Sequence, residues 1–317
     1  MKALTYLLPS EPSEQLRLSA VNIDPPTPAE GEVLVRVHFA GLSEFDLENY
    51  GGKRNKAIAR ALKKGPVISG IEMSGVVDSN GQQFSRGDKV VAYTNIWRGP
   101  FYHAQLVAVP ESNLVLIPDN HSLEGAASIV GGALTSINAL ERIAKLAPDD
   151  SILITGATGS VGVTALQLAS HVGAKTSAVC HSSRMNFALS QGAKDVYAYD
   201  NQELPPASNQ FNVVLDAAPS LSFSRARCFL VPRGLYIPTM PHLDVPGYIL
   251  SLITKQRWGY LMENKTERSR MDRLGDLMAD DAFAPIIDSI HPLASAELAF
   301  KRQCESGKRG KILIDFR

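Results

Sequence analysis

The sequence predicts an α/β protein with a doubly wound parallel sheet and a second, β-rich unit. From residue 123 onward, short β-branched runs alternate with helix-like runs, which is typical of a parallel sheet with helices on both faces. Before residue 120, short alternating runs are separated by Gly, Pro and Asp, which is typical of a compact β-barrel or sandwich. A chain of 317 residues is long enough for both units.

Four strands are predicted in the first third. Glu32–Ala40 alternates apolar and polar side chains, as a half-buried strand does. Gly87-Asp88 is typical of a turn between further strands at 70–77 and 89–93, and another strand covers 104–109.

The α/β part begins with a helical pattern rich in Ala and Leu over 123–147. Its strands are predicted near 151–155, 175–180, 194–199, 211–216, 231–237 and 257–262. Its helices are predicted near 160–172, 183–191, 220–229 and 244–256. The tail contains a helix near 266–281, a strand near 286–290, a helix near 294–305 and a strand at 311–315. We expect the tail to return to the β-rich unit, because a terminal apolar strand needs a sheet edge.

Three glycines, Gly156, Gly159 and Gly162, join the first strand and helix of the α/β part. Free N–H groups and the helix dipole at such a turn favour an anion, and a pyrophosphate suits this geometry best. The turn is one residue longer than the usual dinucleotide fingerprint. The alternative is a structural turn whose glycines only allow close packing.

Charge and cysteine content exclude several classes of partner. The chain has 32 basic and 32 acidic residues, which indicates neither a nucleic acid nor an anionic membrane surface as partner. We expect a cytoplasmic protein, because no apolar run is long enough to span a bilayer and the first residues lack a signal-peptide pattern. The scattered Cys180, Cys228 and Cys304 argue against a disulfide framework and a structural zinc lobe.

The end of the second α/β strand, Cys180-His-Ser-Ser-Arg184, predicts the cofactor. Folds that prefer NAD place an Asp or Glu there, and this segment has none. Arg184 can bind a 2′-phosphate through its planar guanidinium, with Ser182 or Ser183 adding a hydrogen bond. The sequence therefore favours NADPH over NADH. His181 is either a stacking or phosphate-binding residue or an exposed loop histidine.

The chain resembles the medium-chain dehydrogenase/reductase superfamily, and within it the zinc-free quinone oxidoreductases. The segments that carry the resemblance are 1–4, 32–37, 70–77, 87–92, 132–136, 156–162, 291–293 and 310–314. The resemblance implies a GroES-like catalytic domain at 1–120 and 264–317 and a Rossmann dinucleotide-binding domain at 121–263. It also implies a homodimer, since relatives often pair through an edge strand of the nucleotide sheet.

Zinc members of this superfamily have a Cys in the loop after the first long strand and a His-Glu pair after a Gly. Here Ser43 or Glu44 occupies the first position, and Ile71 precedes Glu72 at the second. A catalytic zinc needs three protein ligands, so we expect no metal and a structural role for Glu72 near the cleft. Without a Lewis acid, hydride addition to a conjugated alkene is easier than alcohol oxidation.

The expected activity is therefore NADPH-dependent reduction of a quinone or an α,β-unsaturated carbonyl compound. A non-catalytic NADPH-binding sensor or scaffold and a zinc alcohol dehydrogenase are the alternatives. The resemblance places Ser43 and Asp46 in a loop that faces the nicotinamide. Tyr50 is a candidate proton donor to an enolate, and the alternatives are solvent, a cofactor hydroxyl or a packing role for Tyr50. The alternative for Asp46 is that it caps or positions the loop.

The resemblance also implies cofactor contacts at strand ends, where packing is the alternative role. The pyrophosphate turn contains Gly156, Thr158, Gly159, Ser160, Val161 and Gly162. The other positions are Thr135 near the nicotinamide, Tyr199 against the adenosine phosphate, Ala217 and Ala218 after the fourth strand, and Pro238 and Thr239 after the fifth.

The substrate loops implied by the resemblance, 43–65, 94–102 and 240–262, are aromatic. They contain Trp97, Phe101, Tyr102, Tyr248, Trp258 and Tyr260. This composition suits a small planar apolar substrate, although core packing explains half of these residues equally well. The basic stretch 53–64 is a solvated helix face or a contact for an anionic substrate tail.

Overall fold

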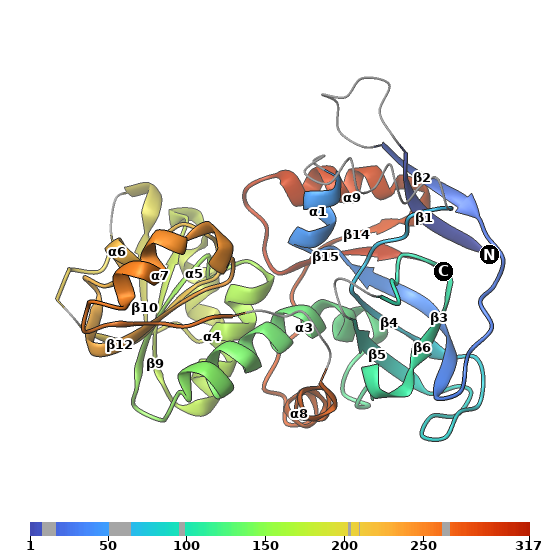
Figure 1. The fold of residues 1–317 in the computed structure, drawn as a ribbon, viewed down its shortest axis with the longest axis horizontal. Helices are drawn as coiled ribbons and strands as arrows, with labels where there is room; N and C mark the ends of the chain where they lie inside the picture. Colours follow the sequence, from blue (N-terminus) through green and yellow to red (C-terminus); the bar gives the residue numbers. More distant parts are fainter. Residues whose placement is uncertain (8–16, 51–64, 95–98, 202–203, 209, 262–266) are drawn as a thin grey trace. The chain divides into compact units, whose positions relative to one another are not determined.

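The computed structural model describes residues 1–7, 17–50, 65–94, 99–201, 204–208, 210–261 and 267–317. The chain divides into two compact units (Figure 1). Unit 1 contains Met1–Gly131, Asn264–Asp280 and Pro285–Arg317, and unit 2 contains Gly132–Glu263 and Asp281–Ala284. The division falls inside helix α3 (Leu123–Ser136) rather than at residue 120, because this helix runs through it without a break.

Unit 2 contains a six-stranded sheet in the order β10-β9-β8-β11-β12-β13, and every pair is parallel. The strands are β8 (Ser151–Thr155), β9 (Lys175–Cys180), β10 (Asp195–Ala198), β11 (Phe211–Asp216), β12 (Leu230–Pro238) and β13 (Arg257–Trp258). Their order is 3-2-1-4-5-6 when they are counted along the chain, which is the doubly wound arrangement of dinucleotide-binding folds. The predicted parallel sheet is therefore confirmed, although β13 is shorter than expected.

Helices pack against the strands of this sheet (Figure 1). They are α4 (Ser160–Val172), α5 (Met185–Ser190), α6 (Phe223–Ala226) and α7 (Val245–Ser251), with 3-10 turns at Ser182–Arg184, Tyr199–Asn201 and Pro241–Leu243. The predicted helix 160–172 is confirmed at both ends, and Gly173 at φ 89° closes it. Three predicted helices are shorter than expected, since 183–191 begins as a 3-10 turn, 220–229 reduces to α6 and 244–256 reduces to α7.

The predicted helix 123–147 consists of two parts. After α3 the chain winds as a π-helix over Ile137–Ala144, and it ends at Lys145 with a left-handed backbone at φ 52°. The hydroxyl of Ser136 lies 2.9 Å from that of Thr164, which ties this helix to α4 inside unit 2.

Unit 1 is built around the long strand β3 (Glu32–Gly41). Its seven-stranded sheet has the order β14-β15-β3-β4-β5-β7, with β6 also paired to β3. The other strands are β4 (Glu72–Val77), β5 (Lys89–Tyr93), β6 (Leu106–Pro110), β7 (Leu114–Leu116), β14 (Ile287–Pro292) and β15 (Lys311–Asp315). Strand β15 pairs antiparallel with β3, so the predicted return of the tail to this unit is confirmed.

One strand pair and one short helix of unit 1 were not predicted. Strands β1 (Lys2–Leu7) and β2 (Arg17–Asn22) form a separate antiparallel pair, and α1 covers Glu44–Tyr50. The predicted helices near 266–281 and 294–305 are confirmed as α8 (Arg268–Ala279) and α9 (Ala296–Cys304), and 3-10 turns lie at Glu111–Asn113 and Leu293–Ser295. The alternation predicted for β3 is confirmed, because Val33, Val35 and Val37 are all buried in the core of this unit.

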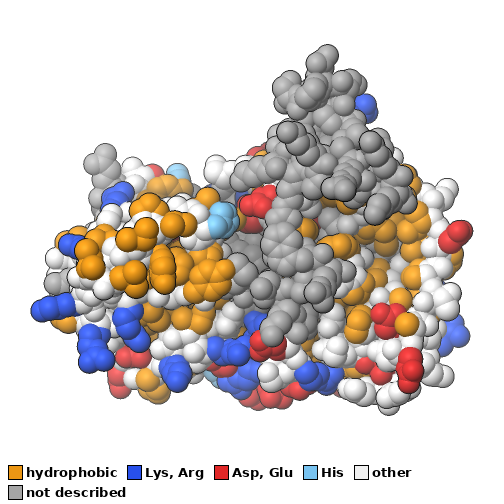
Figure 2. Space-filling model, in the orientation of Figure 1, with side chains coloured by type: hydrophobic (Ala, Val, Ile, Leu, Met, Phe, Trp, Pro, Cys, Tyr) orange, Lys and Arg blue, Asp and Glu red, His pale blue; other side chains and the backbone are white. Residues whose placement is uncertain are grey.

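Exposed apolar side chains concentrate on one part of unit 2. They are Leu243, Val245, Tyr248, Ile249, Leu252, Ile253 and Tyr260, on and beside α7, and Figure 2 shows orange side chains gathered there. Among the described residues, no helix combines the length and the apolar character that crossing a membrane requires. The expected homodimer and the expected planar apolar substrate stay predictions.

Candidate functional site

Two of the three glycines in the turn after β8 are required by the fold itself. Gly156 has a φ of 59°, and a Cβ there would lie 2.5 Å from the Cβ of Ala218. A Cβ on Gly162 would lie 2.2 Å from the carbonyl oxygen of Gly156. Neither position accepts a side chain, because the helix packs directly on the turn.

Gly159 differs from its two neighbours in the motif. Its backbone has ordinary angles, φ −78° and ψ 173°, and a Cβ there would meet only the carbonyl oxygen of Gly156, at 3.5 Å. The fold leaves this position open, so the missing side chain matters to something other than packing. A glycine at the N-cap of α4 lets an anion approach the free N–H groups of the first helical turn.

Ser160, the first residue of α4, has a buried hydroxyl with no hydrogen-bond partner among the described residues. Native structures rarely leave such a group without a partner. An open cradle at Gly159 and an unpaired donor beside it fit a pyrophosphate. Thr158 is buried, and Val161 is half-buried in the first turn of α4.

A buried carboxylate, which sequence reasoning missed, organises the neighbouring strand end. Asp216, the last residue of β11, is 1% exposed and accepts hydrogen bonds from the N–H groups of Ser220 and Leu221. The hydroxyls of Thr155, on β8, and Tyr236, on β12, donate to it as well. Burial raises the pKa of Asp216, and the hydrogen bonds from Thr155, Ser220 and Leu221 oppose the rise. A polar residue at the end of a buried strand was the available signal.

Asp216 thereby positions the predicted cofactor residues around it. Ala217 and Ala218 follow Asp216 in the sequence and precede Ser220, whose N–H donates to the Asp216 carboxylate. Both alanines are half-buried. The N–H and hydroxyl of Thr239 donate to the carbonyl oxygen of Asp216 at 3.1 and 3.0 Å, and Pro238 before it is buried. Strands β8 and β11 are neighbours at the point where the strand order reverses, which is where ligands bind in such sheets. Thr135 is half-buried in the last turn of α3.

The end of β9 requires a correction. The sequence shows no acid in that segment, but the structure places Asp200, from the 3-10 turn after β10, against it. Its carboxylate accepts from the N–H of Ser182 at 2.7 Å and from the Ser182 hydroxyl at 2.6 Å. Because β10 and β9 run parallel, with Ala198 opposite Cys180, the segments after both strands meet at one edge of the sheet.

The surroundings of this carboxylate contain the other predicted nucleotide residues. The Nε2 of His181 lies 3.4 Å from Asp200, and its Nδ1 lies 3.0 Å from the Ser183 hydroxyl. The hydrogen bond from the Ser182 hydroxyl contributes most to lowering the pKa of Asp200 below its ordinary value. Tyr199 is 53% exposed and meets the His181 ring edge-on. Arg184 is half-buried and forms no ion pair with any described residue.

In unit 1, the predicted catalytic residues Ser43 and Asp46 bind one another. Asp46 is completely buried, and its Oδ2 accepts from the N–H and the hydroxyl of Ser43, at 2.9 and 2.7 Å. Its Oδ1 accepts from the N–H of Gly70 at 3.0 Å. Because a serine has a single O–H donor, the half-buried Ser43 hydroxyl is already engaged. Asp46 thus supports the start of α1 in the manner of a capping box, the alternative considered for it.

Tyr50, the third predicted catalytic residue, closes α1 and packs in the core. It is 6% exposed, and its ring centroid lies 5.1 Å from that of Phe300. Burial raises the pKa of its phenol. The catalytic roles of Ser43, Asp46 and Tyr50 stay predictions.

A further buried histidine of unit 1, His103, was not predicted from the sequence. His103 is fully buried, with Nδ1 3.0 Å from the Ser69 hydroxyl and Nε2 3.4 Å from the carbonyl oxygen of Gly41. The hydroxyl of Tyr6 donates to Ser69 at 2.9 Å. Burial lowers the pKa of His103 below its ordinary value. No periodic pattern marks this residue, because the strands that enclose it come from distant parts of the sequence.

Glu72 is a structural carboxylate, as predicted. It is 1% exposed and pairs with the ammonium group of Lys311, the first residue of β15. Its Oε2 accepts the N–H of Gly131 on α3 at 2.7 Å. A Cβ on Gly131 would lie 2.4 Å from that oxygen, so only a glycine permits this approach.

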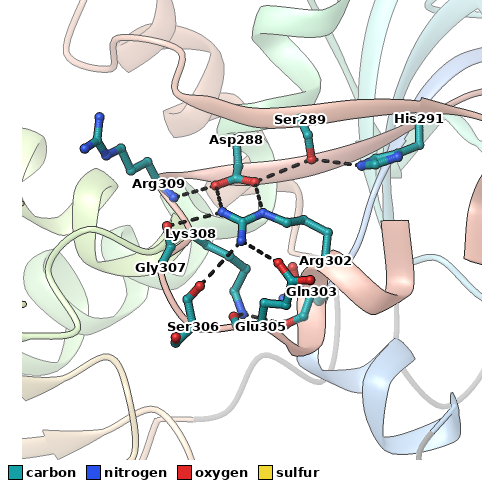
Figure 3. A network of polar contacts seen from close by, with 10 residues as sticks. All are labelled: Asp288, Ser289, His291, Arg302, Gln303, Glu305, Ser306, Gly307, Lys308 and Arg309. Carbon is teal, nitrogen blue, oxygen red and sulfur yellow. Dashed lines mark hydrogen bonds and ion pairs between the residues drawn. The ribbon is translucent and has the colours of Figure 1, made fainter. Parts of the chain in front are cut away.

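A network at the end of α9 fixes the turn that leads to Lys311 (Figure 3). The guanidinium of Arg302 donates to both oxygens of Asp288, on β14, at 2.8 Å each, and the N–H of Arg309 donates to the same carboxylate at 2.8 Å. Burial raises the pKa of Asp288, but the bonds from Arg302 and Arg309 outweigh it, so the pKa is lowered. The network also holds Ser289, whose hydroxyl lies 3.0 Å from His291.

The aromatic residues predicted for the substrate loops have different positions. Tyr102 is completely buried in the core of unit 1, which favours the packing role over a contact with substrate. Phe101 stacks on Phe45 at 6.4 Å in unit 1. On unit 2, the rings of Tyr248, Trp258 and Tyr260 form one cluster. Trp97 and the basic stretch 53–64 lie outside the described residues.

Possible metal ligands do not gather in the part of the chain that the structure describes. Among those residues, no three His, Cys, Asp or Glu side chains lie together as they would around a metal ion. Glu72 lies next to the position where zinc relatives have a ligand. Its carboxylate already binds the ammonium group of Lys311 and the N–H of Gly131.

Comparison with known proteins covers both units. Residues 29–119 match the family described as alcohol dehydrogenase GroES-like domain, and residues 191–314 match the family described as zinc-binding dehydrogenase. The chloroplast envelope quinone oxidoreductase homolog of Arabidopsis thaliana is 28% identical over 314 residues, which are 94% of each chain. The chloroplastic quinone-oxidoreductase homolog of Spinacia oleracea is 29% identical over 316 residues, again with 94% of each chain.

The fold has close counterparts among solved structures. The quinone oxidoreductase from Coxiella burnetii superposes with a TM-score of 0.82 at 23% identity, over 100% of this chain and 99% of that chain. This likeness identifies the unit 1 sheet as a GroES-like domain and the unit 2 sheet as a Rossmann domain. Motifs, sheet order and relatives together make this chain a member of the medium-chain dehydrogenase/reductase superfamily, in its quinone oxidoreductase branch, whose members are oxidoreductases that bind nicotinamide cofactors.

Proposed function

We propose that this protein is an NADPH-dependent reductase that transfers a hydride to a quinone or an α,β-unsaturated carbonyl compound without zinc. The open pyrophosphate cradle carries the proposal, because Gly159 lacks a side chain that the fold would accept and Ser160 holds a buried donor without a partner. Both features are explained by a dinucleotide bound at the start of α4.

The 2′-phosphate of NADPH has a suitable partner in Arg184. Its guanidinium is half-buried after β9 and has no carboxylate partner among the described residues. A guanidinium offers two parallel donors to a phosphate, which makes a short and strong contact. Ser183, which is exposed next to it, adds a second hydroxyl donor.

The reaction that fits these residues needs no metal. When bound, the nicotinamide supplies a hydride, and the acceptor takes up that hydride together with one proton. Ser43 or Glu44, and Ile71, stand where zinc relatives have ligands, and neither serine nor isoleucine is a zinc ligand in these sites. Asp46 holds Ser43 in place and Tyr50 packs on Phe300, so the proton comes from solvent or from a cofactor hydroxyl rather than from these side chains.

The test is NADPH oxidation by the purified chain with a panel of quinones and enones, together with metal analysis of the same sample. We expect turnover with at least one acceptor and no stoichiometric zinc. Tight NADPH binding without turnover of any acceptor would instead support the alternative, a non-catalytic NADPH sensor or scaffold. Stoichiometric zinc and loss of activity with a chelator would indicate an alcohol dehydrogenase.

A further inference from the structure

We propose that Asp200 determines the cofactor choice of this chain by working against the 2′-phosphate that Arg184 attracts. The proposal rests on the nucleotide site of the proposed function, and it predicts that the chain binds NADPH more tightly than NADH by no more than about tenfold. Removing the charge of Asp200 should convert the chain into one that strongly prefers NADPH.

The contacts of Asp200 occupy the donors that a 2′-phosphate would use. Ser182 gives both its backbone N–H and its hydroxyl to this carboxylate, at 2.7 and 2.6 Å. His181 presents its Nε2 to the same carboxylate at 3.4 Å. A phosphate that approaches Arg184 therefore finds the donors of Ser182 already engaged by an anion.

Charge adds to this competition. The hydrogen bond from Ser182 and the nearby His181 both stabilise the ionised form of Asp200. A phosphate monoester carries nearly two negative charges near neutral pH, so a phosphate that approaches Ser182 is repelled by the carboxylate bound there. In water-like surroundings such a repulsion weakens binding roughly tenfold, and Arg184 offsets it.

The same carboxylate can serve NADH. A carboxylate has about four acceptor sites, and the three contacts to Ser182 and His181 leave it able to accept another donor. NAD-preferring folds use such a carboxylate to accept the ribose 2′-hydroxyl. In this chain the acid comes from the strand after the usual one, but it reaches the end of β9 nevertheless.

The experiment measures dissociation constants of the full chain for NADPH and NADH by calorimetry. The same titration with 2′-phospho-ADP-ribose and ADP-ribose isolates the ribose end of the site. We expect Asp200→Asn to tighten binding of the two phosphorylated ligands about tenfold or more and to leave the unphosphorylated pair unchanged or weaker. Asp200→Ser, which also removes the charge, should act in the same direction.

A matched control is Asp195→Asn, because Asp195 is an exposed acid at the other end of the same strand β10. It removes the same charge and should leave the NADPH to NADH ratio unchanged. Equal tightening of all four ligands by Asp200→Asn would overturn the proposal, as would a wild-type NADPH preference above a hundredfold. If wild type and both Asp200 variants bind none of the four ligands, the nucleotide site itself fails, and the proposed function fails with it.

Discussion

The candidate site residues of the two units differ in whether other residues of the protein already bind their polar groups. In unit 1, the buried groups Asp46, Glu72 and His103 all find partners within their own unit. In unit 2, the strand ends leave the hydroxyl of Ser160 and the guanidinium of Arg184 without partners among the described residues. Buried polar groups are normally satisfied, so an open one indicates a place for a ligand.

This difference separates structural polar residues from binding residues. Ser43 and Asp46 have the residue types of catalytic groups, but their donors and acceptors are used to hold α1 and the backbone at Gly70. Gly159 has no functional group at all, yet it leaves open the backbone that binds the cofactor in our proposal. The availability of a group, rather than its chemical type, distinguishes these candidate residues of unit 1 from those of unit 2.

The largest effect is expected for the buried ion pair between Glu72 and Lys311 in unit 1. Lys311→Met leaves Glu72 as a buried charge without its partner, and we expect the free energy of unfolding to fall by about 3–5 kcal/mol. Urea denaturation measures this change. The control Lys301→Met, at an exposed position on α9, should change stability by less than about 0.5 kcal/mol. Wild-type stability for Lys311→Met would mean that the buried pair does not hold this unit together.

Two glycine variants test whether structure and binding separate inside one turn. Gly162→Ala should destabilise the chain by about 1–3 kcal/mol, because its Cβ would lie 2.2 Å from the Gly156 oxygen. Gly159→Ala should keep wild-type stability and weaken NADPH binding about tenfold or more, since the added methyl fills the cradle. Denaturation and calorimetry measure the two properties separately. NADPH binding by Gly159→Ala at wild-type strength would contradict the assignment of the cradle.

The pH dependence of the free energy of unfolding tests the effect of burying His103. Burial lowers the pKa of His103 below 6.5 in the folded chain, so the unfolded chain binds more protons as the pH falls. The contribution of this residue is therefore complete above about pH 6.5 and declines below it, by at most about 1.4 kcal/mol per pH unit. Denaturation at several pH values should show this slope, and His103→Gln should reduce it. An unchanged slope in that variant would assign the proton uptake to another group.

The smallest effects are expected for the groups on α1. Ser43→Ala removes one hydrogen bond to Asp46 and should lower stability by about 1 kcal/mol. Tyr50→Phe keeps the ring on Phe300, and its kcat should stay within about threefold of wild type. Steady-state kinetics with an active acceptor measure this. A loss of about a hundredfold or more would instead make Tyr50 the general acid, as the sequence analysis first considered.

The sequence predicted most elements of unit 2 because they are local. The strand at 151–155 and the helix at 160–172 match their predictions at both ends, since residue pattern and the glycines Gly159 and Gly173 delimit them. The predicted helix 220–229 is shortened to the four-residue α6, because the backbone before it donates hydrogen bonds to Asp216. The pair β1 and β2 lacked a clear signal, since neither strand alternates as regularly as β3.

The sequence by itself determined the α/β class, the glycine turn after the first strand and the candidates for cofactor binding, because each depends on residues that are close along the chain. Only the tertiary structure decided which polar groups are already satisfied. Asp200 reaches Ser182 across 18 residues, and Lys311 reaches Glu72 across 239. Such pairs form because parallel strands bring their ends to one edge and distant segments share one sheet, and no local pattern encodes that proximity.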